Sequence, residues 1–161
     1  MDNKTELVIK NTLDAWHTYL ARTNKLFDEL QDDDLQREVA PGRNTGIYLL
    51  GHLTAVHDGM LPLLGIAEKS YPQLEEVFLR KPDKSGLDQP SIAQLKHYWK
   101  NVNDKLSDAF SHFTMEDWFS KHTLISADDF KNEPNRNKLN VVMNRTNHLA
   151  YHLAQLVFLK K

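Results

Sequence analysis

The segment that decides how this chain folds reads Asn-His-Leu-Ala-Tyr-His-Leu-Ala-Gln-Leu over residues 147–156. It places His148 and His152 four residues apart within a stretch of helical periodicity. Residues at i and i+4 lie above one another on one helix face, so two such imidazoles can bind a single metal ion without bending the backbone. A His-x-x-x-His pair alone is a weak signal. Its meaning depends on the face that it occupies and on a third ligand elsewhere in the chain.

A helix predicted over about residues 137–160 places both histidines on its inward face. That face also carries Arg145 and several apolar residues at steps of three or four, namely Val141, Leu149, Leu156 and Leu159. Asn135 or Asn137 is expected to cap its beginning.

Three further long helices are predicted from apolar residues that recur every three or four positions. They cover about residues 4–31, residues 44–64 and a segment from Ser91 to about Phe113. Asn44 is the expected cap of the second, and Pro62 is expected to kink or end it. Ser91 opens a capping box directly after a proline.

Shorter elements are predicted between the long helices. Thr114 is expected to begin a short helix through Trp118 and Phe119, and another is possible around residues 73–79. Residues 121–136 are predicted to be a loop.

Four long amphipathic helices without a competing strand pattern predict an all-α fold, a four-helix bundle in a single domain over residues 1–161. Residues 65–90 form a connection long enough to run back along the bundle. We therefore expect the second and third long helices to be parallel.

Composition excludes several classes of function. The 161 residues are 40% hydrophobic and 26% charged, as in a globular protein, and the formal net charge of −2 lacks the basic excess that binds nucleic acid or anionic membranes. There is no cysteine, which excludes disulfides and thiolate ligands and fits a reducing compartment. No apolar run reaches membrane-spanning length and no signal-peptide pattern is present. These features predict a cytoplasmic protein.

His52 lies in the inward apolar row of the second long helix, so three histidines face the interior. Each is either a hydrogen-bonded core histidine or a metal ligand, because a neutral imidazole brings one donor and one acceptor into an apolar interior. Three neutral imidazoles suit zinc, nickel, iron or copper, and three protein ligands leave coordination positions open.

The other histidines are interpreted differently. His57 follows His52 by five residues, about 140° around the helix, and cannot share its position. It is interpreted as a surface or loop histidine, like His97, His112 and His122. His17, beside the apolar stripe of the first helix, is a spare candidate ligand.

Two segments resemble the DinB/YfiT-like superfamily of metal-binding four-helix bundles. They are Asn-Thr-Gly-Ile-Tyr-Leu-Leu-Gly-His-Leu at residues 44–53 and the histidine pair with its neighbours at residues 148–156. Ala154 stands where the family often has glycine. The resemblance implies an up-down-down-up bundle in which His52, His148 and His152 bind a divalent transition metal, zinc or nickel.

The resemblance also implies a range of functions. Characterised relatives include thiol S-transferases that use bacillithiol or mycothiol and a thiol-dependent isomerase, while other members have no known activity. The expected function is therefore metal-dependent transfer of a low-molecular-weight thiol or hydrolysis of a small molecule. The alternative is a non-catalytic stress or binding protein with a structural or vestigial metal site, so whether the chain is an enzyme stays open.

Three neighbours of the histidines are candidate site residues. Arg145, three residues before His148, either holds a substrate carboxylate, pairs with an acid of a neighbouring helix or extends to the bundle end. Tyr48, one turn before His52, either donates a hydrogen bond near the metal or belongs to the core. Gln155 is a candidate to orient His152 from the second coordination shell.

The chain is also expected to assemble with a second copy of itself. Trp118 and Phe119 are large aromatic residues in a connecting segment, where there is less core to enter. The resembled family is often dimeric, so a homodimer is expected.

Overall fold

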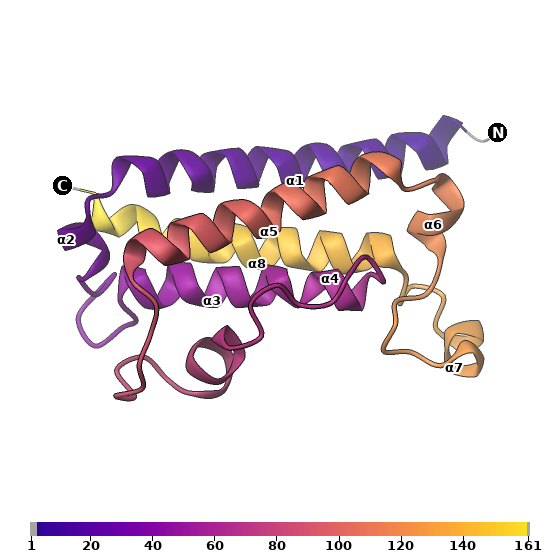
Figure 1. Cartoon of the computed structure of the whole chain (residues 1–161). Coiled ribbons are helices and arrows are strands. Elements are labelled where there is room, and N and C mark those ends of the chain that lie inside the picture. The colour runs from indigo at the N-terminus through magenta and orange to yellow at the C-terminus, as the bar shows by residue number, and fades with distance from the viewer. Residues whose placement is uncertain (1–2, 161) are drawn as a thin grey trace.

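The computed structural model describes residues 3–160, and its regular elements are all helical (Figure 1). The elements are α1 (Asn3–Glu29), α2 (Asp32–Leu35), α3 (Gly46–Asp58), α4 (Met60–Leu63), the π-helical turn η1 (Glu76–Arg80), α5 (Ile92–His112), α6 (Met115–Phe119), α7 (Ala127–Asn132), α8 (Lys138–Leu156) and the 3₁₀ turn η2 (Val157–Leu159). Extended pairing within the described part is limited to two isolated bridges, Glu38 with Thr45 and Lys121 with Asn137. The predicted all-α fold is confirmed.

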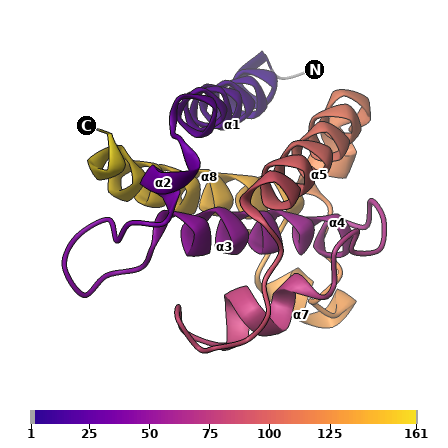
Figure 2. The ribbon, with the colours of Figure 1, turned by 60° about the vertical axis from the view of Figure 1, so that its left-hand side comes forward.

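Four long helices form the bundle in up-down-down-up order. In Figure 1, α1 and α8 run from right to left, whereas α3 and α5 run from left to right. α1 packs on α8, and α3 packs on both α5 and α8. The view in Figure 2 separates α1 from α5 above the α3–α8 pair. Large aromatic rings fill the space between them, with Phe27 edge-on to Trp99 at 5.7 Å and Trp16 edge-on to Phe110 at 5.8 Å between ring centroids.

α3 is buried on more than one face because α5, α8 and η1 all pack against it. Gly51 allows the close approach of η1, since a Cβ atom there would overlap the ring of Phe78. A helical glycine costs about 1 kcal/mol relative to alanine, so its presence next to His52 reflects this packing. The contact brings the backbone of η1 against the middle of α3.

Side-chain caps set the beginnings of the long helices, largely where the sequence places them. Ser91 and Gln94 form the predicted capping box of α5, and Asn137 caps α8 by accepting from the Asn140 N–H. The cap of α3 is Thr45 rather than Asn44, with the Thr45 hydroxyl accepting from the Tyr48 N–H.

The second long helix is shorter than predicted. It breaks at Gly59, three residues before Pro62, and resumes as the single turn α4. Proline has no N–H for the carbonyl four residues earlier, here that of Asp58, and its ring crowds that carbonyl. The break therefore precedes the proline instead of following it.

Residues 121–136 are predicted to be a loop, but they contain the short helix α7. Ser126 caps this helix by accepting from the Asp129 N–H, and Asp128 and Asp129 occupy its first turn, where negative charge is favourable. A helix of six residues that is stabilised by its cap is too short to show apolar periodicity.

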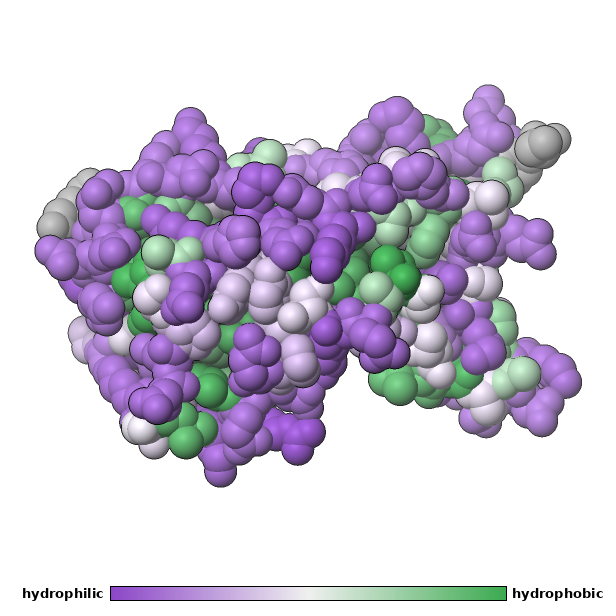
Figure 3. All heavy atoms as spheres, in the orientation of Figure 1, coloured by the Kyte–Doolittle hydropathy of each residue, from purple (hydrophilic) through white to green (hydrophobic). Residues whose placement is uncertain are grey.

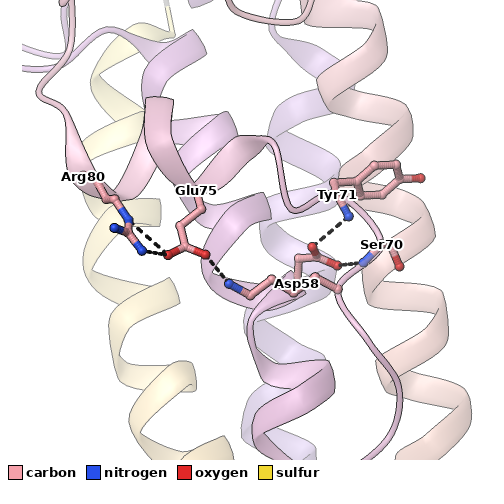
Figure 4. A network of polar contacts seen from close by, with 6 residues as sticks. Asp58, Ser70, Tyr71, Glu75 and Arg80 are labelled. Atoms are coloured by element: carbon pink, nitrogen blue, oxygen red, sulfur yellow. Dashed lines mark hydrogen bonds and ion pairs between the residues drawn. The ribbon is translucent and has the colours of Figure 1, made fainter.

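The connection after α4 is tied to the end of α3 by a buried carboxylate (Figure 4). Asp58 is 1% exposed and accepts from the Ser70 and Tyr71 N–H groups at 2.8 and 2.9 Å. Glu75 then pairs with both Arg80, at 2.6 Å, and Lys69. These contacts hold residues 69–80 against α3.

Trp118 does not support the homodimer expectation. It is 2% exposed and packs edge-on against Phe113 and Phe110, with ring centroids 4.9 and 5.3 Å away, so the bundle core absorbs it. Phe119 is 39% exposed. The homodimer stays a prediction that rests on Phe119 and the resemblance. Within residues 3–160, no helix combines the length and apolar character needed to cross a membrane.

Candidate metal centre

The structure brings His52 of α3 together with His148 and His152 of α8. The Nε2 atom of His148 lies 3.2 Å from that of His52 and 3.0 Å from that of His152. The candidate ligand atoms of the three residues all lie within 4.8 Å of one another. Nitrogens bound tetrahedrally to one zinc ion at about 2.0–2.1 Å are about 3.3 Å apart, so the spacing suits a shared ion.

The outer nitrogens of two rings have fixed partners. His52 Nδ1 donates to the Phe78 carbonyl at 2.9 Å, and His152 Nδ1 donates to the Gln155 side-chain oxygen at 2.7 Å. With the proton on Nδ1, the Nε2 lone pairs of both rings face the centre, the tautomer that binds a metal. This hydrogen bond supports the orienting role of Gln155, which stays a prediction.

His148 differs from the other two. Its Nδ1 atom is buried and has no hydrogen-bond partner among the described residues. Burial, followed by the charges of His152, His52 and Arg145, lowers the pKa of His148 to about 4. Burial also lowers the pKa of His152, partly offset by its hydrogen bond to Gln155. Both rings are therefore neutral near pH 7, the form required of a metal ligand.

The centre is open on one side. His52 and His148 are half-buried, and His152 is 9% exposed. Among residues 3–160 the cluster gathers three His, Asp or Glu side chains and no fourth. Three imidazoles with free positions fit zinc or nickel and resemble catalytic rather than structural zinc sites. The role of the three residues as ligands stays a prediction that this geometry supports.

Tyr48 lies beside the centre, but its hydroxyl is directed away from it. The ring stacks on His52 at 6.3 Å between centroids with an angle of 12°, and the hydroxyl donates to the Lys81 carbonyl at 2.7 Å. The structure thus favours the core alternative for Tyr48. Its hydroxyl fastens the end of η1, and its ring supports His52 from one side.

Arg145 has no acidic partner within the described part of the chain. It is half-buried and lines a cavity bordered by α3, α8 and the two long connections. Arg145 therefore neither pairs with an acid of a neighbouring helix nor extends fully into solvent at the bundle end.

His57 corrects the sequence interpretation, since it is a core residue with 0% exposure. Its Nδ1 atom donates to Asn103 Oδ1 at 2.7 Å, and its ring lies between Trp16 and Trp99 at 4.9 and 4.8 Å. His57 does lie on a different face of α3 from His52, as expected. That face is buried because α5 packs against it. The spare candidate His17 is exposed and lies outside the cluster.

One functional group was missed by sequence reasoning, the backbone carbonyl of Phe78 that holds His52. A backbone acceptor leaves no residue-type signal. The usable sign is Gly51, a mid-helix glycine next to a candidate ligand, which marks a close approach of another segment.

Comparison with known proteins adds one finding. The family model of the DinB superfamily matches residues 15–156, which include all three histidines of the cluster. No curated protein matches the chain.

Proposed function

The chain belongs to the DinB superfamily, and on that premise we propose that its three-histidine centre binds zinc or nickel and transfers a low-molecular-weight thiol to a small electrophilic substrate. The observation that carries the proposal is the convergence of three Nε2 atoms, 3.0 and 3.2 Å apart, at a side of the bundle where His52 and His148 are only half-buried. The proposal fits the predicted cytoplasmic location, because thiols stay reduced in that compartment.

When bound, a divalent ion with open positions lowers the pKa of a coordinated thiol or water, so that a nucleophile forms near neutral pH. The chain's own part is to fix the orientation of the imidazoles. The Phe78 carbonyl and the Gln155 side chain do this for His52 and His152 through hydrogen bonds of 2.9 and 2.7 Å.

The transfer balances as a nucleophilic substitution. The thiol gives up its proton to solvent, its sulfur forms a bond to the electrophilic carbon, and the leaving group departs with the electron pair of the bond that breaks. Hydrolysis follows the same balance with water in place of the thiol, so the centre is compatible with either nucleophile.

The proposal is tested on protein purified without a His tag. Metal content is measured by mass spectrometry, and zinc- and nickel-loaded samples are assayed with a chlorobimane dye and bacillithiol, mycothiol, glutathione or cysteine. We expect one ion per chain and thiol-dependent formation of the conjugate. His148→Ala should abolish both, whereas His97→Ala, which removes an exposed histidine of α5, should retain both.

The outcomes separate the candidate functions. Consumption of the electrophile without thiol would identify a hydrolase. Bound metal without turnover of any pair would favour the non-catalytic stress or binding protein.

A further inference from the structure

A cavity lies about one helical turn from the histidine centre, along α3 and α8. Its volume is about 360 Å³, and its walls include Val56, Leu63, Leu79, Leu124, Lys69 and Arg145. Figure 3 shows the surface hollowed between the part of the molecule around η1 and the part around α7. Most of the lining is apolar, with cationic groups as its charged members.

The two cations of this cavity differ in their pairing. Lys69 is neutralised by Glu75, which also binds Arg80 (Figure 4). Arg145 forms no hydrogen bond and no ion pair with any residue in the range 3–160, and burial lowers its pKa. A half-buried guanidinium without a protein partner is less well hydrated than one in bulk water, so its attraction to an anion is less screened. A ligand that supplies an anion would therefore pair favourably with Arg145.

The place of Arg145 ties the cavity to the histidine centre. It precedes His148 by three residues on α8, about 5 Å along the same helix face. Across the cavity, Val56 follows His52 by four residues on α3. The cavity therefore lies one helical turn from the centre along both helices.

We propose that this cavity binds a small amphipathic carboxylic acid, with Arg145 holding the carboxylate and the apolar walls facing the hydrocarbon part. The guanidinium presents two parallel N–H donors that match the two oxygens of a carboxylate. One unpaired cation balances one negative charge, which favours a monoanion over a phosphate. That the acid is a substrate rests on the proposed function, and that it binds here does not.

The test uses hexanoate as the probe, with acetate and hexanamide for comparison. Each is titrated into zinc-loaded protein by calorimetry, for the wild type, Arg145→Met, Arg145→Lys and Arg136→Met. Arg136 is the matched control because it is half-buried like Arg145 and lies just before α8. Unlike Arg145, it pairs with Glu133 and lies outside the cavity.

We expect hexanoate to bind the wild type and Arg136→Met alike, and Arg145→Met about ten- to a hundredfold more weakly with its zinc retained. Arg145→Lys should fall between them, because it keeps the charge but loses the paired donors. Acetate should bind more weakly than hexanoate by about fourfold for each methylene that the walls bury. Hexanamide should not bind.

Equal affinity of the wild type and Arg145→Met for hexanoate would overturn the inference, as would the absence of binding to the wild type. A repeat with metal-free protein separates this inference from the proposed function. Arg145-dependent hexanoate binding in a protein that takes up neither zinc nor nickel would sink the proposed function and leave the inference standing. Zinc uptake without hexanoate binding would overturn the inference and leave the proposed function standing.

Discussion

His52 and His57 lie five residues apart on α3, yet they belong to two different regions of the molecule. His52 is half-buried between α3 and α8, where its Nε2 atom meets that of His148 at 3.2 Å. His57 is fully buried toward α5, between two tryptophan rings, with Asn103 as its fixed acceptor. The two regions share one feature, because in each the Nδ1 atom of the histidine donates a hydrogen bond to a fixed acceptor.

The difference lies in what faces the second nitrogen. At His52 the Nε2 atom meets two further imidazoles on an open side of the bundle. At His57 the Nε2 atom is buried and has no partner among the described residues. Solvent access and additional ligands make the first region a candidate metal centre, whereas tight ring packing makes the second a part of the core.

The largest effect on metal content is expected from His52→Ala. Because one of three ligands is lost, we expect metal binding to be abolished while the helical far-UV signal persists. Metal analysis together with circular dichroism measures both. Retention of a full equivalent of metal by this variant would contradict the ligand assignment.

His57→Ala is expected to have the opposite pattern. Removing a fully buried ring from between Trp16 and Trp99, and leaving Asn103 without its donor, should lower the free energy of unfolding by about 3 kcal/mol. The folded fraction should still bind one ion. Urea denaturation gives the first quantity and metal analysis the second. Normal stability with lost metal would show that His57 belongs to the centre.

Gln155→Leu tests whether a residue beside the ligands matters without binding metal itself. It keeps the side-chain volume but removes the acceptor of His152 Nδ1, so the metal affinity should fall about ten- to a hundredfold. Competition with a chromophoric chelator measures this affinity. Gln73→Leu, which changes an exposed glutamine, is the control and should leave the affinity unchanged.

The pH dependence of stability should distinguish His57 in metal-free protein. Burial lowers the pKa of His57 from 6.5 to about 3, while its hydrogen bond to Asn103 opposes the shift. Between these values the unfolded chain binds the proton more readily than the folded one. Stability is therefore fully present above about pH 6.5 and is lost as the pH falls toward 3, by at most about 1.4 kcal/mol per pH unit from this residue.

The matched variant for this measurement is His57→Gln, which is neutral at every pH. Its unfolding free energy should fall less steeply than that of the wild type between pH 6 and 5, as measured by urea denaturation at each pH. Parallel profiles would mean that His57 does not resist protonation.

The smallest effect is expected from His17→Ala. His17 is exposed on α1 and outside the cluster, so the metal content should not change and the free energy of unfolding should move by less than about 0.5 kcal/mol. A loss of metal in this variant would show that α1 supplies a ligand.

Local sequence specifies the features that depend on near neighbours along the chain. The spacing of His148 and His152 and the capping box at Ser91 each lie within about four residues, and the sequence limited the cap of α8 to Asn135 or Asn137. Helical periodicity also identified the inward row that contains His52. These features follow from the geometry of one helix, which local sequence fixes.

The faces of each helix that other elements cover are set by the tertiary packing. His57 is buried because α5 packs on a second face of α3, which a helix with one apolar face would expose to solvent. The tertiary packing also supplies the Phe78 carbonyl to His52, and it leaves Arg145 in a cavity without an acid. Such contacts join residues far apart in the chain, so no local spacing encodes them. They depend on how the helices and their long connections pack.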